Sequence, residues 1–374
     1  MAAKRLTSLD GLRGIAALAV VVWHWQHFFA VGGMWQQGWQ RTAQPFYWLL
    51  KPLYIQGWAA VDLFFVLSGF VFFWLYSEGV RTRAVSGRQF ALLRFSRLYP
   101  LHLVLLLLVA GMQFLIFRAY GNFFIYQAND VPHFVAHLFM VQNWWPRSEQ
   151  TFDGPSWSVS IEVLLYLIFF LLCRVGLKRR GQILIVALAG AALLPFDEHI
   201  GRGISGFFMG GFVFTLWDSL RGNARAPMIS RALMIAALAG WIGLFAMLYA
   251  DSPWLDGGEG NGTFLLAFDF GLCPLTVLVL ALREHLHGRA SAPLAHLGDI
   301  SYATYMIHFP LQLLLALIAL HVGLTARFFM QGWVMIAFYA VLIALGTASY
   351  RFFERPMQHW IRDRRSRAVA AIAD

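Results

Sequence analysis

Charged side chains are scarce in this sequence: aspartate, glutamate, lysine and arginine together make up 13% of its 374 residues, whereas 59% are hydrophobic and 16% aromatic. Soluble globular domains carry about 25% charged residues, so this composition excludes an ordinary soluble protein. The mean hydropathy of +0.61 agrees with that exclusion. We therefore expect one all-α polytopic membrane domain over residues 1–374, embedded in the lipid bilayer.

Cysteine is scarce as well. Cys173 and Cys273 are the two that occur, both in apolar segments, with no paired spacing and no histidine cluster beside them. This pattern excludes a disulfide framework, and no metal site is expected. The first apolar run is too long for a signal-peptide core and lacks a small-residue cleavage site. The net charge of +10 is dispersed between apolar segments, so no nucleic-acid partner is expected.

Apolar windows of about 20 residues predict the membrane-crossing helices. There are about ten, of which the fifth and sixth are short and are also compatible with a re-entrant pair. The windows are 9–30, 57–77, 97–117, 157–174, 182–196, 203–218, 229–250, 263–282, 301–321 and 328–352.

The distribution of basic residues predicts the orientation of the bundle. With the N-terminus inside, 23 of the 29 lysine and arginine residues fall in inner segments. Cytoplasmic loops carry such an excess, so both termini are predicted to be cytoplasmic, including a basic tail over residues 354–374. The net positive charge is then largely explained by orientation.

The first window carries polar residues that lipid disfavours, namely Asp10, Arg13 and His24. Arg13 and His24 are eleven residues apart, which places them within about 20° of one helix face and about 16 Å apart along the axis. One reading is a topogenic arginine and a buried, hydrogen-bonded histidine. The other is a functional pair on one face.

Three carboxylates share the level of His24 when depth is counted from the outer surface. Asp62, Glu162 and Asp269 each lie about 7 to 9 Å below it at the helical rise. This predicts a lined cavity, in which a histidine and a carboxylate form a general base. We prefer Glu162 as the partner, because "PSWSVSIE" surrounds it with hydroxyls and an indole. Asp62 and Asp269 are equally compatible with caps or pairs across helices.

A basic cluster is predicted at the inner ends of the helices. "RFSRLYP" places Arg94 and Arg97 three residues apart, close in level to Arg13 and Asp10. Two arginines on one helix face can bind phosphate bidentately, although topology alone also explains each of them. His308, in "SYATYMIHFP", is compatible either with a site residue or with a packing hydrogen bond near a proline kink.

Aromatic residues gather in two long outer loops, 31–56 and 118–156. An interfacial aromatic belt explains them, and so does stacking against sugar rings at the outer mouth.

Six stretches in order resemble the signatures of the acyltransferase 3 family of integral membrane O-acyltransferases, from Leu6 to Pro356. In that family an arginine and a histidine on the first helix are functional, and the pattern falls on Arg13 and His24. A second glutamate often follows the first in the fourth stretch, whereas Val163 stands here. The stretches are "LTSLDGLRGIAALAVVVWHW", "AAVDLFFVLSGFVFFWLY", "RFSRLYPLHL", "PSWSVSIEVLLY", "LGDISYATYMIHFPL" and "RFFERP".

The resemblance implies transfer of an acyl group, often acetyl, from cytoplasmic acyl-CoA to a hydroxyl of an extracytoplasmic glycan or other envelope acceptor, in the inner or plasma membrane. His24 would be the general base, Glu162 its partner, and Arg13, Arg94 and Arg97 the acyl-CoA-binding residues. Many relatives add a soluble hydrolase-like domain; this sequence stops at Asp374, so we expect direct transfer. Further residues expected to line the site are Asp10, Asp62, Ser68, Trp157, Tyr305 and His308.

The alternative function is a proton-coupled transporter or flippase for an envelope lipid or glycan, because buried carboxylates and histidines also mark proton relays. Transporters often contain two related halves, and the sequence has no such internal repeat.

Overall fold

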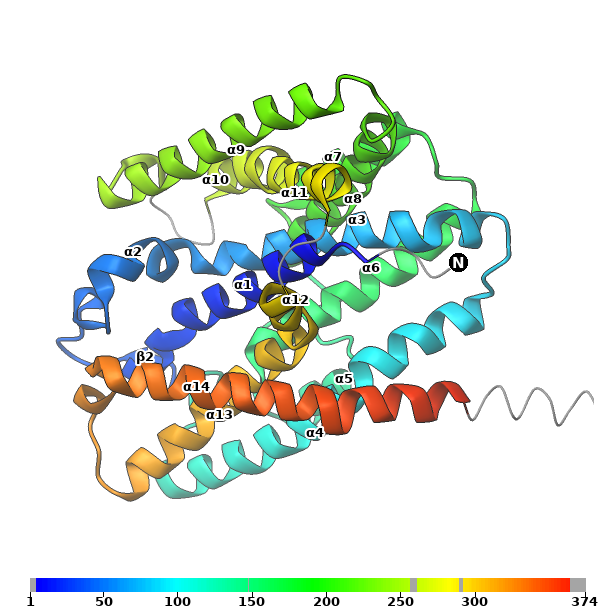
Figure 1. Ribbon diagram of the computed structural model, residues 1–374. Helices are drawn as coiled ribbons and strands as arrows, with labels where there is room; N and C mark the ends of the chain where they lie inside the picture. The colour runs from blue at the N-terminus through cyan, green and yellow to red at the C-terminus, as the bar shows by residue number, and fades with distance from the viewer. Residues whose placement is uncertain (1–4, 147, 256–260, 289–291, 364–374) are drawn as a thin grey trace, which may run out of the picture.

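The computed structural model describes residues 5–146, 148–255, 261–288 and 292–363. Long helices pack into one bundle (Figure 1), which confirms the predicted all-α membrane architecture. Within the described residues the only strands are β1 (Ala30–Val31) and β2 (Met34–Trp35), paired as a short antiparallel hairpin. The helices are α1 (Thr7–His24), α2 (Tyr47–Gln56), α3 (Ala60–Arg81), α4 (Gly87–Tyr120), α5 (Val131–Leu138), α6 (Trp157–Arg174), α7 (Arg180–Leu193), α8 (Glu198–Leu220), α9 (Ala226–Tyr249), α10 (Gly262–Ala267), α11 (Cys273–His287), α12 (Ala292–Asp299), α13 (Ser301–His321) and α14 (Gly332–Ala348).

Seven segments are long and apolar enough to cross a membrane, judged by length and composition over the described residues. Each overlaps one of the ten predicted windows. The other three windows correspond to α1 and α8, which carry charged residues inside their apolar runs, and to α7, which has 14 residues. The seven are Tyr47–Arg81, Gly87–Tyr120, Gly154–Arg174, Ala226–Tyr249, Gly262–His287, Ser301–His321 and Gly332–Asp363.

Two helices extend beyond their predicted windows. The helix predicted over 97–117 begins at Gly87, where the Ser86 hydroxyl accepts a hydrogen bond from the Gln89 amide at 3.2 Å. The last helix continues from α14 through a π-helical turn (Ser349–Glu354) to Asp363. The tail predicted over 354–374 is therefore helical at its start, and its residues 364–374 lie outside the described residues.

Glycines bring α3 and α8 into backbone contact. A Cβ atom at Gly69 would lie 1.7 Å from the carbonyl oxygen of Phe207, and one at Gly210 would lie 2.0 Å from that of Val66. Small residues allow this close approach between membrane helices, where van der Waals packing replaces the hydrophobic effect as the main attraction. The contact fixes α8 against α3, which carries site residues.

The start of α1 is anchored by a carboxylate from another helix. Glu284, near the end of α11, accepts hydrogen bonds from the backbone amides of Thr7 and Ser8 at 2.8 and 2.7 Å, and from both hydroxyls. These are first-turn amides that lack partners within their own helix, and a negative charge there also suits the helix dipole. Figure 1 shows α1 in the interior of the bundle, where it contacts α3, α12 and α13.

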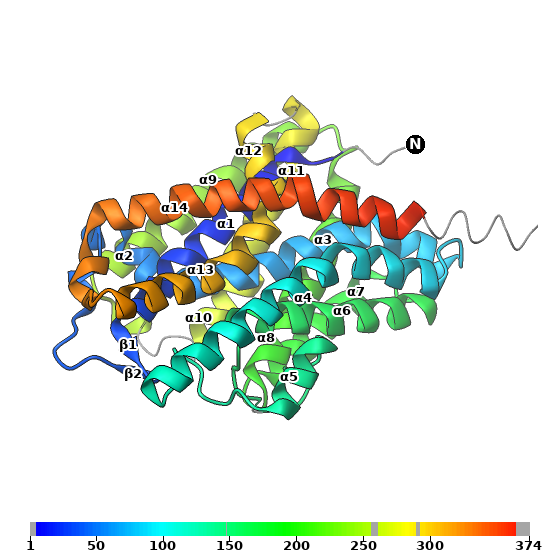
Figure 2. The same ribbon diagram turned by 90° about the horizontal axis from the view of Figure 1, so that it is seen from below.

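The two ends of the bundle differ. The β1–β2 hairpin and α2 lie at one end, and the last helix finishes at the other, the end toward which the start of α1 points; both views agree (Figure 2). The first predicted outer loop, residues 31–56, therefore lies at the end opposite to the final residues of the C-terminal helix.

Candidate functional site

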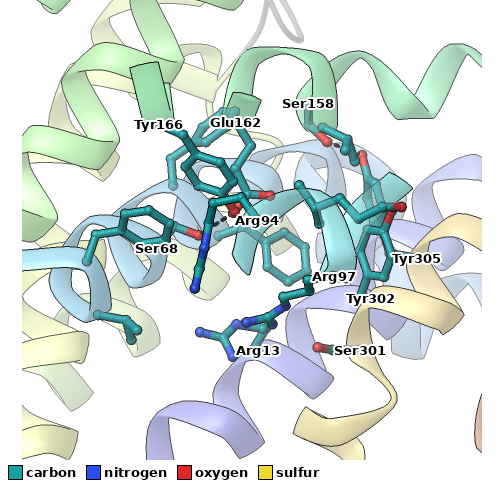
Figure 3. Close-up of a pocket in the computed structure, with 16 residues that line it drawn as sticks. Arg13, Ser68, Arg94, Arg97, Ser158, Glu162, Tyr166, Ser301, Tyr302 and Tyr305 are labelled. Carbon is teal, nitrogen blue, oxygen red and sulfur yellow. Dashed lines mark hydrogen bonds between the residues drawn. The ribbon is translucent and has the colours of Figure 1, made fainter. Parts of the chain in front are cut away.

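A polar cavity of about 80 Å³ lies among α1, α3, α4, α6 and α13. Several water molecules or one phosphate-sized group would fill it. Figure 3 shows its polar side chains converging from these five helices. They are Arg13, Ser68, Arg94, Arg97, Ser158, Glu162, Tyr166, Ser301, Tyr302 and Tyr305.

Arg13 reaches the cavity from the second turn of α1. Its Nη1 donates to Asp10 Oδ1 at 3.2 Å, one helical turn earlier. Asp10 also pairs with Arg5, and Arg5 bonds to Asp299 at 2.6 Å. Asp10 is thus part of an ion-pair chain that ties the start of α1 to α12, and it is not among the residues that line the cavity.

Arg94 is held by aromatic rings on one wall of the cavity. Its guanidinium carbon lies 4.9, 4.7 and 5.8 Å from the ring centres of Phe72, Tyr76 and Tyr166. The group also donates to the Tyr76 hydroxyl at 2.5 Å, while its buried Nε has no hydrogen-bond partner. Cation–π contacts restrain the charge without neutralising it.

Arg97 follows one turn later on α4. Its guanidinium points toward that of Arg13 (Figure 3). Within the described residues Arg97 has no hydrogen bond and no ion pair, and its side chain is exposed. Two guanidinium groups that face each other across a cavity repel one another, so an anion between them would be stabilised. The predicted convergence of Arg13, Arg94 and Arg97 is present.

Glu162 lies on the α6 side of the same cavity. One of its carboxylate oxygens accepts hydrogen bonds from Ser68 Oγ at 3.0 Å and from the Tyr166 hydroxyl at 2.6 Å. The predicted pairing of Glu162 with His24 is wrong, because His24 bonds elsewhere and does not line the cavity. Ser68, predicted as a site residue, lines the cavity and orients the carboxylate.

His24 pairs with His308 instead. His24 Nδ1 lies 3.0 Å from His308 Nε2, and the two rings stack with centres 4.9 Å apart. His308 is fully buried, and its Nδ1 bonds to the Tyr305 backbone carbonyl, one turn earlier on α13. Of the two readings of His308, the structure favours the site residue, because His308 is hydrogen-bonded to the predicted base.

Tyr305 connects the histidine pair to the cavity. Its side chain lines the cavity, and its hydroxyl bonds to Ser158 Oγ at 2.7 Å and to the Pro155 carbonyl at 2.6 Å. Its backbone carbonyl accepts from His308. The arginine-lined cavity and the histidine pair are therefore neighbours through one residue of α13.

The other predicted carboxylates do not line this cavity, and they follow the second reading, pairs across helices. Asp62 is fully buried and pairs with Arg202 of α8, and Asp269 accepts from Ser205 at 3.2 Å. Trp157, also predicted as a site residue, lies 5.1 Å from Arg202 and does not line the cavity. Helical depth alone does not give the direction in which these residues face.

Two contributors were missed from the sequence. Arg202 falls between the predicted windows 182–196 and 203–218, although "HIGRGISGFF" places it in an apolar, glycine-rich run. Gln312 donates to the His24 backbone carbonyl at 2.9 Å, and its Oε1 lies 3.2 Å from His27 Nδ1. A glutamine inside the apolar run "HFPLQLLL" was a signal for such a role, because unpaired polar groups are costly within a membrane.

Metal ligands do not gather in the part of the chain that the structure describes: no group of three or more histidine, cysteine, aspartate or glutamate side chains could hold an ion there.

Comparison with known proteins identifies relatives over most of the chain. The acyltransferase MdmB of Streptomyces mycarofaciens is 29% identical over 333 residues, covering 82% of this chain and 78% of the relative. The O-acetyltransferase OatA of Staphylococcus aureus is 25% identical over 393 residues, covering 94% of this chain and 57% of the relative. The peptidoglycan O-acetyltransferase OatA of Listeria monocytogenes is 25% identical over 397 residues, covering 95% and 56%. No solved structure matches.

The family model described as an acyltransferase domain matches residues 6–351. This match confirms the resemblance found in the six stretches, although the chain spans little more than half the length of the two O-acetyltransferases. The chain is a multi-pass membrane protein that belongs to the acyltransferase 3 family.

Proposed function

We propose that this protein is a membrane O-acyltransferase that moves an acyl group, in the first instance acetyl, from acyl-CoA to a hydroxyl of an extracytoplasmic glycan or other envelope acceptor. The observation that carries the proposal is the convergence of three arginines on one cavity beside the His24–His308 pair. Charged side chains within membrane segments are rare and usually mark a substrate or ion pathway.

The donor end of the reaction is assigned to Arg13, Arg94 and Arg97. The cavity of about 80 Å³ is much smaller than a nucleotide, so it would hold one phosphate or the reactive end of the donor, with the remainder outside. Arg97 has no protein partner within the described residues and is available for a bidentate bond to a phosphate. Glu162, across the cavity, limits the net positive charge.

The transfer step is assigned to His24. The imidazole removes the proton from the acceptor hydroxyl, and the oxygen attacks the thioester carbonyl carbon. The carbon–sulfur bond then breaks, and the proton passes from the imidazolium to the departing CoA thiolate. One ester forms for each thioester consumed, so no metal or redox cofactor is needed. Positioned proton transfer of this kind contributes about 10²- to 10⁴-fold to a rate.

The acceptor is assigned as a carbohydrate because two relatives carry the name O-acetyltransferase and one is named for peptidoglycan. The hairpin end of this chain offers aromatic surfaces of the right kind: Trp35 and Trp39 stack with centres 4.6 Å apart, and Trp35 is 51% exposed. Exposed indole rings suit either a membrane interface or the faces of sugar rings.

The orientation follows from the basic residues. An inner or plasma membrane location with both termini cytoplasmic would place the arginine cavity within reach of cytoplasmic acyl-CoA and the β1–β2 hairpin on the outside. The start of α1 and the end of the last helix point toward the same end of the bundle, as this orientation requires (Figure 1).

Purified protein in detergent, given acetyl-CoA and a panel of envelope glycans, tests the function. The expected result is release of free CoA thiol together with a labelled ester on one class of glycan, both lost in His24→Gln. A protein that moves a labelled glycan or lipid across proteoliposomes without consuming acetyl-CoA would instead be the transporter or flippase.

A further inference from the structure

A buried hydrogen-bond chain joins α13 to the end of α1. It runs from the Tyr305 backbone carbonyl to His308 Nδ1, and from His308 Nε2 to His24 Nδ1 over 3.0 Å. His308 is fully buried, whereas His24 is partly exposed. His308 therefore lies deeper in the protein than His24, and His24 is the one that an incoming molecule could reach.

The order of donors in this chain follows from its fixed end. A backbone carbonyl can only accept, so His308 Nδ1 carries a proton. In a neutral imidazole the other nitrogen is then an acceptor, which makes His308 Nε2 the acceptor for His24. His24 Nδ1 must donate, and the lone pair of the His24 ring is left on Nε2.

The surroundings of Nε2 agree with an exposed lone pair. Within the described residues no hydrogen bond is formed at His24 Nε2, and this atom is not among the buried polar atoms that lack a partner. It therefore retains some accessible surface. His102 and His137, by contrast, each have a completely buried Nδ1 and an Nε2 that is already hydrogen-bonded.

The backbone that carries His24 is fixed as well. Gln312, one turn beyond His308 on α13, donates to the His24 carbonyl at 2.9 Å where α1 ends. Its Oε1 accepts from His27 Nδ1, so His27 is bonded to Gln312 and not to His308. Along this series of hydrogen bonds, His308 is therefore the one side chain that accepts the proton of His24 Nδ1.

We propose that His308 is the positioning residue for His24: it holds the His24 ring in the Nδ1–H form and directs the Nε2 lone pair toward the acceptor hydroxyl. The inference rests on the proposed function, in which His24 is the base. When Nε2 takes the acceptor proton, the Nδ1–H bond to His308 is retained and stabilises the imidazolium. The proton then leaves from Nε2 to the CoA thiolate, and His308 gains and loses none.

Two substitutions separate positioning from packing. His308→Leu fills the site but cannot accept a hydrogen bond, and acyl transfer should slow by about 10²-fold, within the usual worth of a positioned base. His308→Gln places an amide oxygen near the former Nε2 and should restore most of that rate. KM for acetyl-CoA should stay the same in both, because His308 does not line the arginine cavity. Equal rates for the two variants would overturn the positioning role.

A control and a second readout keep the test independent of activity. His102→Gln alters another buried histidine, which bonds to the His137 carbonyl at 2.8 Å, and should leave the rate within about twofold. Nitrogen-15 spectra of histidine-labelled protein should give the Nδ1–H form for the resonance lost in His24→Gln, and a mixture of forms in His308→Leu. An Nε2–H form in the wild type would refute the inference even if the transfer assay succeeds. An inactive wild type with the Nδ1–H form would refute only the proposed function.

Discussion

Arg202 binds Asp62 through two parallel hydrogen bonds in the interior of the bundle, from Nε to Oδ1 at 2.9 Å and from Nη2 to Oδ2 at 2.8 Å. Both side chains are almost completely buried, and the guanidinium lies between the rings of Trp58 and Trp157. The pair joins α3 to α8 close to the first turn of α3. We assign this ion pair a structural role, because each buried charge is stabilised by the other.

Removing one member of this pair should destabilise the protein. Asp62→Ala leaves a buried guanidinium with one carboxylate partner fewer, and loss of one partner of a buried ion pair costs about 3–5 kcal/mol. Thermal unfolding in detergent measures the effect. Glu78→Ala, which breaks the more exposed pair with Arg81, is the control and should change the midpoint little. An Asp62→Ala protein that unfolds at the wild-type midpoint would contradict this assignment.

The same pair shows what the sequence could not reveal. Hydropathy predicts membrane windows at α3 and α8 and a level for Asp62, but it does not tell which face meets which helix. Arg202 itself falls between two predicted windows, so its partner could not be predicted. The predicted grouping of Arg13, Arg94 and Arg97 is present, because α1 and α4 bring these side chains to one cavity. The His24–Glu162 pairing failed because equal depth on two helices does not imply facing sides.

Donor binding should depend on Arg97. Arg97→Ala removes a guanidinium that has no protein partner within the described residues. The substitution should therefore weaken ligand binding without breaking a contact within the protein. One hydrogen bond to a charged group is worth about 1.5–3 kcal/mol, which corresponds to about a 10- to 10²-fold weaker Kd for CoA. Arg97→Lys should recover part of this, because a point charge lacks the planar fork. Arg88→Ala, on the same helix and outside the cavity, is the control. Isothermal titration at two salt concentrations is the measurement, and unchanged affinity in Arg97→Ala would exclude it from the donor site.

Neutralising Glu162 should act in the opposite direction on the donor. Glu162→Gln keeps an acceptor oxygen for Ser68 and Tyr166 but removes a negative charge from the arginine-lined cavity. A phosphate should then bind a few-fold more tightly, since a like charge nearby is lost. Competition binding with free CoA tests this, with Ser68→Ala as the control that weakens one hydrogen bond and keeps the charge. Weaker binding in Glu162→Gln would show instead that the carboxylate holds the arginines in place.

Asp153, just before α6, should make stability depend on pH. Burial raises the pKa of this carboxyl to about 8. Because the folded pKa lies above that of the unfolded chain, near 3.8, the stabilising contribution is complete below about pH 4 and is lost as the pH rises to about 8. Asp153→Asn cannot ionise, so it should unfold at a higher temperature than the wild type at pH 8.5 and show a smaller difference at pH 5. If the two proteins differed in unfolding temperature by the same amount at both pH values, the prediction would be contradicted.

The most informative substitution concerns His24. The protein should remain folded in His24→Ala, because the histidine lies at the end of α1 and the start of that helix is held independently by Glu284. Acyl transfer should nevertheless slow by about 10²- to 10⁴-fold, the usual worth of a positioned general base. Donor affinity should change little, because Arg13 lies about 16 Å away along the helix axis. Stopped single-turnover assays with labelled acetyl-CoA separate these two quantities.

The decisive comparison is between His24→Gln and His321→Gln. Glutamine at position 24 can still hydrogen-bond to His308 and has a similar volume, but it cannot take up and release a proton, so it should be nearly as inactive as alanine. Glutamine at position 321, at the exposed end of α13, should leave transfer unchanged. A purely structural histidine would tolerate glutamine at position 24, because its hydrogen bond and its packing are both preserved. Wild-type transfer by a well-folded His24→Gln protein would therefore show that the proton moves to another group, and the free Nε2 of this ring would lose its role in the reaction.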